Sequence, residues 1–185
     1  MSGKSRILRL MPVLDFGGVE SRIVLQAAMV DRERFDFRVC TFSRAGSAAE
    51  RIREVGIPVD CLDVAPSIRS LATTRALRAY LDANRPNLVH ASISEAVFHG
   101  VLANASLGRR RIPFIAEEVG MPARRRVGRV VYGRMFAAAD AAVAVSDACR
   151  RYLRDDEGVP EAKLRLIYNC AHPRFFEVPM LSLDG

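Results

Sequence analysis

The chain has 185 residues, of which half are hydrophobic, and it carries a formal net charge of +7. This length supplies one domain with a real core, and no apolar run reaches the roughly 18 residues that a membrane span needs. We therefore expect one large domain, or one domain and a small part of another, whose basic surface meets phosphate groups, an anionic membrane or nucleic acid.

The opening stretch combines a predicted strand, a turn and a helix. Residues 6–14 are apolar enough for a buried strand, residues 15–18 form a sharp turn, and residues 19–30 have the character of a helix. Glycines between a strand and a helix let the backbone approach a ligand, and the helix start presents free N–H groups and partial positive charge. Gly17 and Gly18 therefore predict either a phosphate-binding turn or simply a tight turn.

Strand and helix patterns alternate along the rest of the chain. Short apolar or alternating runs predict strands at residues 35–42, 58–64, 88–91, 112–116, 141–145 and 164–168. Helical spacing predicts helices at residues 47–55, 67–84, 95–107, 125–139 and 146–156, with Ser47 and Glu50 spaced as a capping box. This alternation predicts a Rossmann-like, doubly wound, mostly parallel sheet with helices on both faces.

The cysteines and histidines predict neither disulfides nor a metal site. Cys40, Cys61, Cys149 and Cys170 form no Cys-x-x-Cys pair, and two fall in apolar strand patterns, which is typical of reduced, mostly buried thiols in a cytosolic protein. The N-terminus leads straight into a strand that contains a charged residue, so we expect no secretory signal. The three histidines lack helical i, i+4 spacing and cysteine partners, so we expect no metal.

Ligands of doubly wound sheets bind at the carboxyl ends of the strands. Five polar positions follow predicted strands, and we expect them to meet along one rim: Gly17–Gly18, His90–Ser92, Glu117–Glu118, Ser146 and Asn169. Glu117 and Glu118 are adjacent, so they point to opposite sides if the strand persists, and at most one faces the cleft. That carboxylate either orients or deprotonates a ligand hydroxyl, or the pair caps the next helix or binds the arginines that follow. His90 is either a ligand contact or a core histidine.

The excess positive charge is concentrated in two runs, Arg109–Arg111 and Arg124–Arg126. Arginine clusters hold phosphate bidentately, and the second run is followed by Val127, Val130 and Val131 at helical spacing. This surface predicts a phosphate site or contact with an anionic bilayer, or else a solvated charged face.

Four segments carry a resemblance to a known family. The longest segment begins with residues 139–146, Ala-Asp-Ala-Ala-Val-Ala-Val-Ser, and includes Gly158-Val159-Pro160, residues 163–164 and Ile167-Tyr168-Asn169. A second segment, Pro173 to Phe176, follows it. Gly17-Gly18-Val19-Glu20 stands near the start, and Val89-His90-Ala91 stands between. In this order the segments resemble the N-terminal domain of the family-four glycosyltransferases, retaining enzymes with the two-domain GT-B fold.

The resemblance implies a division of the chain and a reaction. Residues 1–175 would form a Rossmann-like acceptor-binding domain, residues 176–185 a tail or the start of an inter-domain linker, and the C-terminal nucleotide-sugar-binding domain would be supplied elsewhere. The implied reaction moves a sugar from a nucleotide sugar, with no metal or other cofactor, to a saccharide or lipid-phosphate acceptor in cell-envelope or exopolysaccharide synthesis. The half alone would be inactive, in the cytoplasm or peripheral on the inner face of the cell membrane.

The resemblance also assigns residues. Gly17 and Gly18 would meet the donor diphosphate, and Glu118 stands where many members have a catalytic histidine. Acceptor binding would fall to His90, Ser92, Glu117, Arg124, Arg125 and Asn169. The sequence departs from the family at Ser92, where a second histidine is usual, and at Cys170, where glycine is usual.

Three other functions compete with this interpretation. A dinucleotide-dependent oxidoreductase or sugar epimerase should show Gly-x-Gly-x-x-Gly and an acidic end to the second strand, whereas this chain has Gly-Gly-Val-Glu and Thr41-Phe42-Ser43. A non-catalytic binding or scaffold module fits the missing second domain. Nucleic-acid binding ranks last, because no aromatic stacking platform or recognition motif lies beside the arginines.

Overall fold

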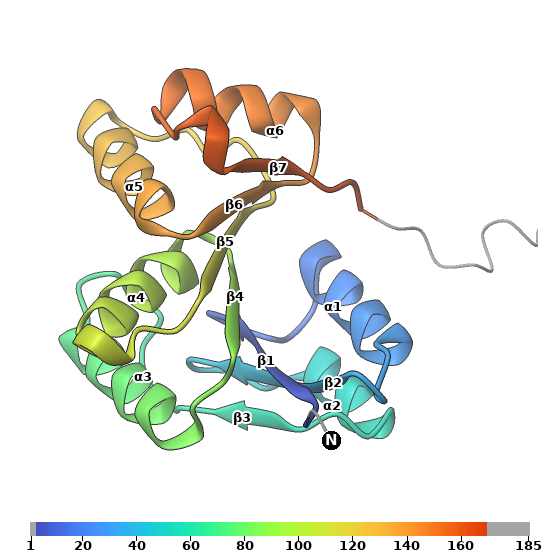
Figure 1. The fold of residues 1–185 in the computed structure, drawn as a ribbon. Helices are drawn as coiled ribbons and strands as arrows, with labels where there is room; N and C mark the ends of the chain where they lie inside the picture. The colour runs from blue at the N-terminus through green and yellow to red at the C-terminus, as the bar shows by residue number, and fades with distance from the viewer. Residues whose placement is uncertain (1–2, 170–185) are drawn as a thin grey trace, which may run out of the picture.

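The computed structural model describes residues 3–169, and it contains a sheet of seven parallel strands in the order β3-β2-β1-β4-β5-β6-β7 (Figure 1). The strands are β1 (Ser5–Met11), β2 (Phe35–Thr41), β3 (Val59–Cys61), β4 (Leu88–Ser92), β5 (Phe114–Glu118), β6 (Ala141–Ala144) and β7 (Leu164–Leu166).

Helices connect successive strands. The α-helices are α1 (Gly18–Met29), α2 (Ser47–Glu54), α3 (Leu71–Asn84), α4 (Ser94–Ala105), α5 (Arg126–Ala138) and α6 (Asp147–Arg151). Shorter turns are the 3₁₀ segments η1 (Gly108–Arg110) and η3 (Glu161–Lys163) and the π-helical segment η2 (Tyr152–Asp156), which continues α6. Among these helices none is both long and apolar enough to cross a bilayer.

The helices lie on both faces of the sheet. In Figure 1, α1 and α2 lie on one side of β1–β3, and α3, α4 and α5 lie on the other. Each face has its own core: one contains Ile23 and Ile52 of the first two helices, the other Leu77 and Val97 of the next two. Because both faces are covered, β6 is apolar throughout, whereas β2 and β3, toward one edge of the sheet, keep polar residues between apolar ones. The predicted Rossmann-like α/β class is therefore confirmed.

Several local expectations are wrong. Ser47 does not cap α2: Gly46 is its N-cap, and the Ser47 hydroxyl instead donates to the carbonyl oxygen of Asp15 at 3.1 Å. The helix expected from residue 67 begins at Leu71, because Ser70 caps it by accepting a hydrogen bond from the Thr73 amide. The third and last strands are shorter than predicted, at three residues each.

The thiols follow the prediction only in part. Cys40 and Cys149 are buried, whereas Cys61 is exposed because it lies on β3, at the edge of the sheet. Cys170, Pro173–Phe176 and the proposed boundary at residue 175 lie outside the described residues.

Candidate functional site

The carboxyl ends of the strands form the candidate site, and the glycine turn lies at the end of β1. Gly17 is the N-cap of α1 and supplies no side-chain cap to the first amides of the helix, while the carboxylate of Glu20 in the first turn lies beside Gly17. A Cβ placed on Gly18 would meet no atom within 4 Å, whereas one on Gly17 would overlap the carboxylate of Glu20. The approach to the helix start is therefore open on the Gly18 side.

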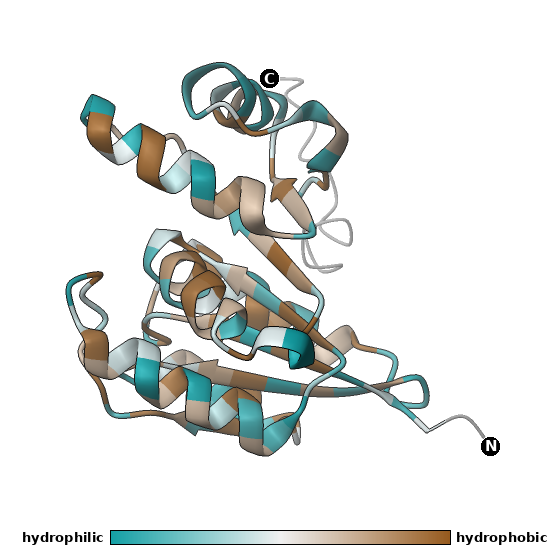
Figure 2. Cartoon of the chain, turned by 60° about the vertical axis from the view of Figure 1, so that its left-hand side comes forward, coloured by the Kyte–Doolittle hydropathy of each residue, from teal (hydrophilic) through white to brown (hydrophobic). Residues whose placement is uncertain are grey.

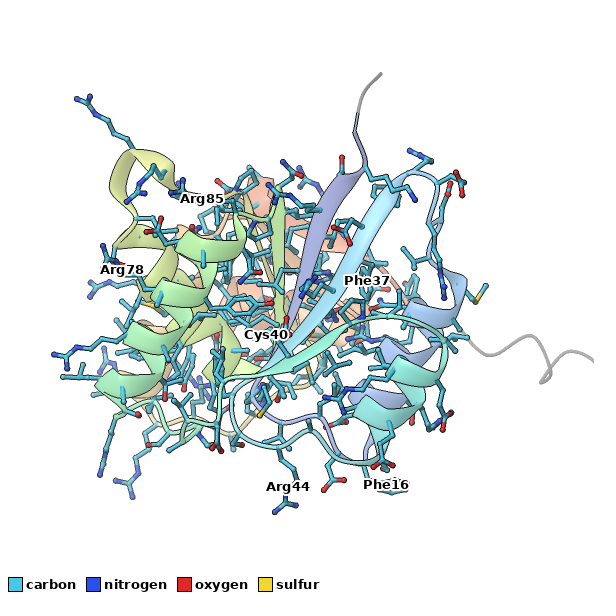
Figure 3. All side chains as sticks on the ribbon, turned by 90° about the horizontal axis from the view of Figure 1, so that it is seen from below. Phe16, Phe37, Cys40, Arg44, Arg78 and Arg85 are labelled. Carbon is cyan, nitrogen blue, oxygen red and sulfur yellow. The ribbon has the colours of Figure 1, made fainter. Side chains whose placement is uncertain are left out.

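Asp15 fixes this turn to the neighbouring loop. Its carboxylate pairs with Arg44 at 3.0 Å, and its carbonyl oxygen accepts from the Ala48 amide at 3.0 Å. Phe16, next in the chain, is 91% exposed, and Figure 3 shows Phe16 and Arg44 projecting away from the sheet at the same edge. The turn is thus held by the start of α2 while its outer surface stays free.

A buried ionic cluster lies behind the turn, on the face of the sheet that α1 covers. The Glu117 cluster consists of Arg9, Arg22, His90, Ser92 and Glu117. Arg9 and Glu117 are only 1% and 2% exposed and form an ion pair, and Arg22 binds the other oxygen of Glu117 at 2.6 Å. The Ser92 hydroxyl donates to Glu117 and accepts from Arg9 at 2.6 Å. One carboxylate thus holds β1, α1 and β4 to the end of β5.

Two arginines against one carboxylate leave this cluster with excess positive charge. Burial by itself would raise the pKa of Glu117, but the contact with His90 and the charges of Arg9 and Arg22 outweigh burial, so this pKa lies well below its ordinary value. Burial, and then the charge of Arg9, lowers the pKa of His90 to about 4. Its Nε2 lies 3.4 Å from Glu117. At neutral pH, His90 is therefore an uncharged imidazole beside an ionised carboxylate.

Arg22 joins the cluster to the end of the described chain. Its Nη1 donates to Asn169 Oδ1 at 2.8 Å and to Glu117 at 2.6 Å. Arg22 lies one turn into α1, so the residues beyond β7 are tied to the helix that carries the glycine turn. Asn169 is exposed, unlike the cluster beneath it.

A second buried cluster lies on the opposite face. The Arg124 cluster consists of Ser94, Glu118, Arg124, Tyr152 and Glu157. Arg124 binds Glu118 at 3.0 Å, pairs with Glu157, donates to Ser94, and lies 4.2 Å from the Tyr132 ring centre. Burial raises the pKa of Glu118 against the opposing hydrogen bond and charge of Arg124. The cluster fixes the β5–α5 connection to the start of α4.

The backbone between the two clusters is strained. Ile93 has φ +72° and ψ +145°, outside the usual regions for a β-branched residue. It stands between Ser92 and Ser94, each held by a different cluster. Such strain costs roughly 1–3 kcal/mol and persists only where the surroundings impose it, often at functional sites.

The structure brings together most of the predicted residues, with different roles. His90, Ser92, Glu117 and Asn169 meet in one network, and Ser146 caps α6 by accepting from the Cys149 amide at 3.1 Å. Glu117 and Glu118 point to opposite faces, as predicted, and both are buried, so neither faces an open cleft; this agrees with the expectation that at most one of them would. Arg124 is buried in ion pairs and so does not extend the exposed run that begins at Arg125. Acceptor binding and catalysis by these residues stay predictions.

Sequence reasoning missed Arg9 and Arg22. The available signal was a charged residue between Leu8 and Leu10 in a strand whose neighbours are apolar. A fully buried arginine needs an acidic partner, and the neighbouring strands offer one in Glu117. Over residues 3–169, the side chains of His, Cys, Asp and Glu form no group of three that could hold a metal ion.

The fold is a doubly wound parallel sheet, and ligands of this class of fold bind at the carboxyl ends of the strands. The sequence model of Glycosyltransferase Family 4 matches residues 16–175. The chain therefore belongs to this family. A search of the curated proteins gave no match.

Solved structures share the fold at low identity. HepE of Anabaena, crystallised with UDP and glucose, is 20% identical with a TM-score of 0.75, over 92% of this chain and 46% of that one. A glycosyltransferase of Rickettsia africae is 15% identical with a TM-score of 0.72, over 99% and 48%. The UDP-N-acetylglucosamine 2-epimerase of Rickettsia bellii is 15% identical with a TM-score of 0.58, over 88% and 44%. The chain thus spans about half the length of these proteins.

Proposed function

We propose that this chain is the acceptor-binding half of a retaining glycosyltransferase that uses a nucleotide-sugar donor. The acceptor is a saccharide or a lipid-phosphate-linked sugar, and the reaction belongs to cell-envelope or exopolysaccharide synthesis on the cytoplasmic side of the membrane. The nucleotide-binding half is a second domain or a partner chain, and without it this half does not turn over. No metal or other cofactor takes part.

The observation that carries the proposal is the open start of α1 on a family-four domain. Gly18 is exposed with free space where a side chain would lie, and no side chain caps the helix. A helix start of this kind attracts a diphosphate through its free amides and partial positive charge. The crystallised HepE complex contains UDP, which fits this class of donor.

In this proposal the buried glutamates of the two clusters position the elements around the site and do not contact substrate. Glu117 positions α1 through Arg22, and Glu118 positions the β5–α5 connection through Arg124. The exposed Asn169 and the exposed surface of the glycine turn are then the groups at this edge that reach a substrate.

The test compares Gly18→Ala and Gly18→Leu with the unchanged protein, in the full-length gene product. Gly18 needs no positive φ and has open space around it, so both variants should melt like the unchanged protein. Transfer should fall modestly with alanine and by at least about a hundredfold with leucine, because the larger side chain covers the helix start. Normal transfer by a folded Gly18→Leu protein would remove the turn from the reaction.

Two further readouts separate the finer parts of the proposal. The anomeric configuration of the product, read by NMR, should match that of the donor, and an inverted product would refute retention. Nucleotide sugar incubated without acceptor should stay unchanged; formation of an epimer would favour the epimerase alternative. Absence of any turnover by the full-length product with a panel of donors and acceptors would favour a binding module.

A further inference from the structure

The outward face of α5 places apolar side chains in solvent. Helix residues whose positions face away from the sheet include Val127, Val130 and Val131, with exposed fractions of 76%, 47% and 36%. The inward positions are occupied by Gly133 and Phe136. A surface helix normally turns its valines toward the core, so this stripe is on the opposite face from the one that folding requires. Figure 2 shows α5 with brown and teal bands along its length.

The exposed arginines at the start of α5 and along its outer side form no ion pair with any acidic side chain of residues 3–169. Arg125, Arg126 and Arg134 are exposed, and none of them forms an ion pair with a described acidic side chain, whereas Arg129, nearer the sheet, binds Asp156 at 2.8 Å. The helix itself contains no acidic residue. The α5 surface, defined as these three arginines and the three valines, therefore combines unneutralised positive charge with exposed apolar area.

The position of the arginines does not serve helix stability. Arg125 and Arg126 stand at the N-terminus of α5, where the helix dipole disfavours positive charge, and no acidic residue lies in the first turn. An external anion reverses this penalty. The other arginine run is different, because Arg110 binds Asp82 at 2.8 Å and Arg111 binds Asp140 at 2.6 Å.

We propose that the α5 surface is a docking face for an anionic lipid bilayer, on which α5 lies parallel to the membrane. Valines at the level of the acyl boundary and arginines at the phosphate level are the arrangement of interfacial helices. The helix of 13 residues is about 20 Å long, which is enough for such a contact. Met121, 60% exposed in the loop before α5, extends the apolar area toward the strand ends.

Docking through α5 also orients the molecule. The helix begins where the β5–α5 connection leaves the strand ends, so its N-terminal arginines lie on the same side as the glycine turn. The strand ends would then be close to the lipid headgroups. This consequence rests on the proposed function, since it places an acceptor-binding edge where a lipid-linked acceptor is presented; the docking itself does not depend on it.

The experiment is co-sedimentation of the protein with vesicles of equal parts phosphatidylglycerol and phosphatidylcholine, and with phosphatidylcholine alone, in 50 and 500 mM NaCl. The unchanged protein should bind the anionic vesicles, and the high salt should weaken this binding. Each arginine near an anionic surface contributes about fivefold, so Arg125→Ala, Arg126→Ala and Arg134→Ala together should weaken binding by roughly a hundredfold. Val127→Ser, Val130→Ser and Val131→Ser together should weaken it by about tenfold.

The matched control removes the same number of arginines elsewhere. Arg109→Ala, Arg110→Ala and Arg111→Ala together should leave vesicle binding within about twofold, because two of these charges are neutralised by acids. Replacing the three α5 arginines by lysine should preserve binding, since a bilayer needs only point charges. All substituted side chains of the α5 surface are exposed, so the melting temperatures should not fall; loss of Arg125 and Arg126 from the helix start should raise them slightly.

Three results would overturn the proposal. The first is an equal loss of vesicle binding in the α5 and control variants. The second is equally strong binding to neutral and to anionic vesicles. The third is a dimer in solution that the valine substitutions convert to a monomer. Transfer to a water-soluble acceptor, measured in parallel, should not respond to the three valine substitutions, which touch none of the residues assigned to acceptor binding. If the unchanged protein transfers sugar but does not bind anionic vesicles, the docking face is refuted and the proposed function stands. If it binds the vesicles but does not transfer sugar, the docking face stands and the proposed function is refuted.

Discussion

Glu117→Gln tests whether one carboxylate holds the strand ends together. The substitution keeps the shape of the side chain but leaves Arg9 and Arg22 buried without a counter-charge. Removing one partner of a buried ion pair costs about 3–5 kcal/mol. For a domain of this size, 1 kcal/mol corresponds to about 2–4 °C, so the melting temperature at pH 7 should fall by roughly 6–20 °C.

The control is Glu118→Gln on the adjacent residue. Arg124 would keep its pair with Glu157, and burial already raises the pKa of Glu118, so its neutral form is the less costly one. We expect a loss of about 1–2 kcal/mol at most. Thermal and urea unfolding followed by circular dichroism measure both variants. Equal melting temperatures for Glu117→Gln and the unchanged protein would refute the counter-charge reasoning.

Acid titration gives a second measurement that does not depend on the variant folding. Because the folded pKa of Glu117 is below its ordinary value of 4.5, its contribution is complete above about pH 4.5 and is lost as the pH falls toward the folded value. The unchanged protein should therefore lose stability below pH 4.5 more steeply than Glu117→Gln. Adding Arg22→Met to Glu117→Gln should recover part of the loss, since one stranded charge is removed.

The remaining predictions concern a histidine and a pair of glycines. The His90 pKa is about 4 in the folded protein and 6.5 in its ordinary state, so the unfolded chain binds the extra proton first, and stability should fall by about 3 kcal/mol from pH 6.5 to pH 4. Chemical unfolding across this range should show a smaller change of the unfolding free energy with pH for His90→Asn; an identical change would exclude a lowered pKa of His90. Gly133→Ala should lower the melting temperature by several degrees, because its Cβ would overlap the backbone carbonyl of Glu157. Gly128→Ala on the same helix, with 3.4 Å to the nearest atom, should change it by no more than about 2 °C, and similar effects at the two glycines would contradict this packing.

The sequence alone was sufficient for the architecture. Strand patterns alternating with helical spacing predicted a parallel doubly wound sheet, because neighbouring parallel strands need a crossover helix between them. It also placed His90, Ser92, Glu117 and Asn169 at strand ends, which the structure brings into one network. Element ends were predicted less well, because caps such as Ser70 and Gly46 depend on which neighbour completes the hydrogen bond.

Only the tertiary structure decided what the charged residues do. Arg9 and Glu117 are 108 residues apart, and their pairing depends on the register of β1, β4 and β5, which no local pattern contains. Likewise, three consecutive arginines look equivalent in sequence, yet Arg124 is buried between two glutamates while Arg125 and Arg126 face solvent. Local spacing reports which residues share a face of one helix or strand. Which charge is neutralised depends on the other elements that pack against that face, and this is settled only when the chain folds.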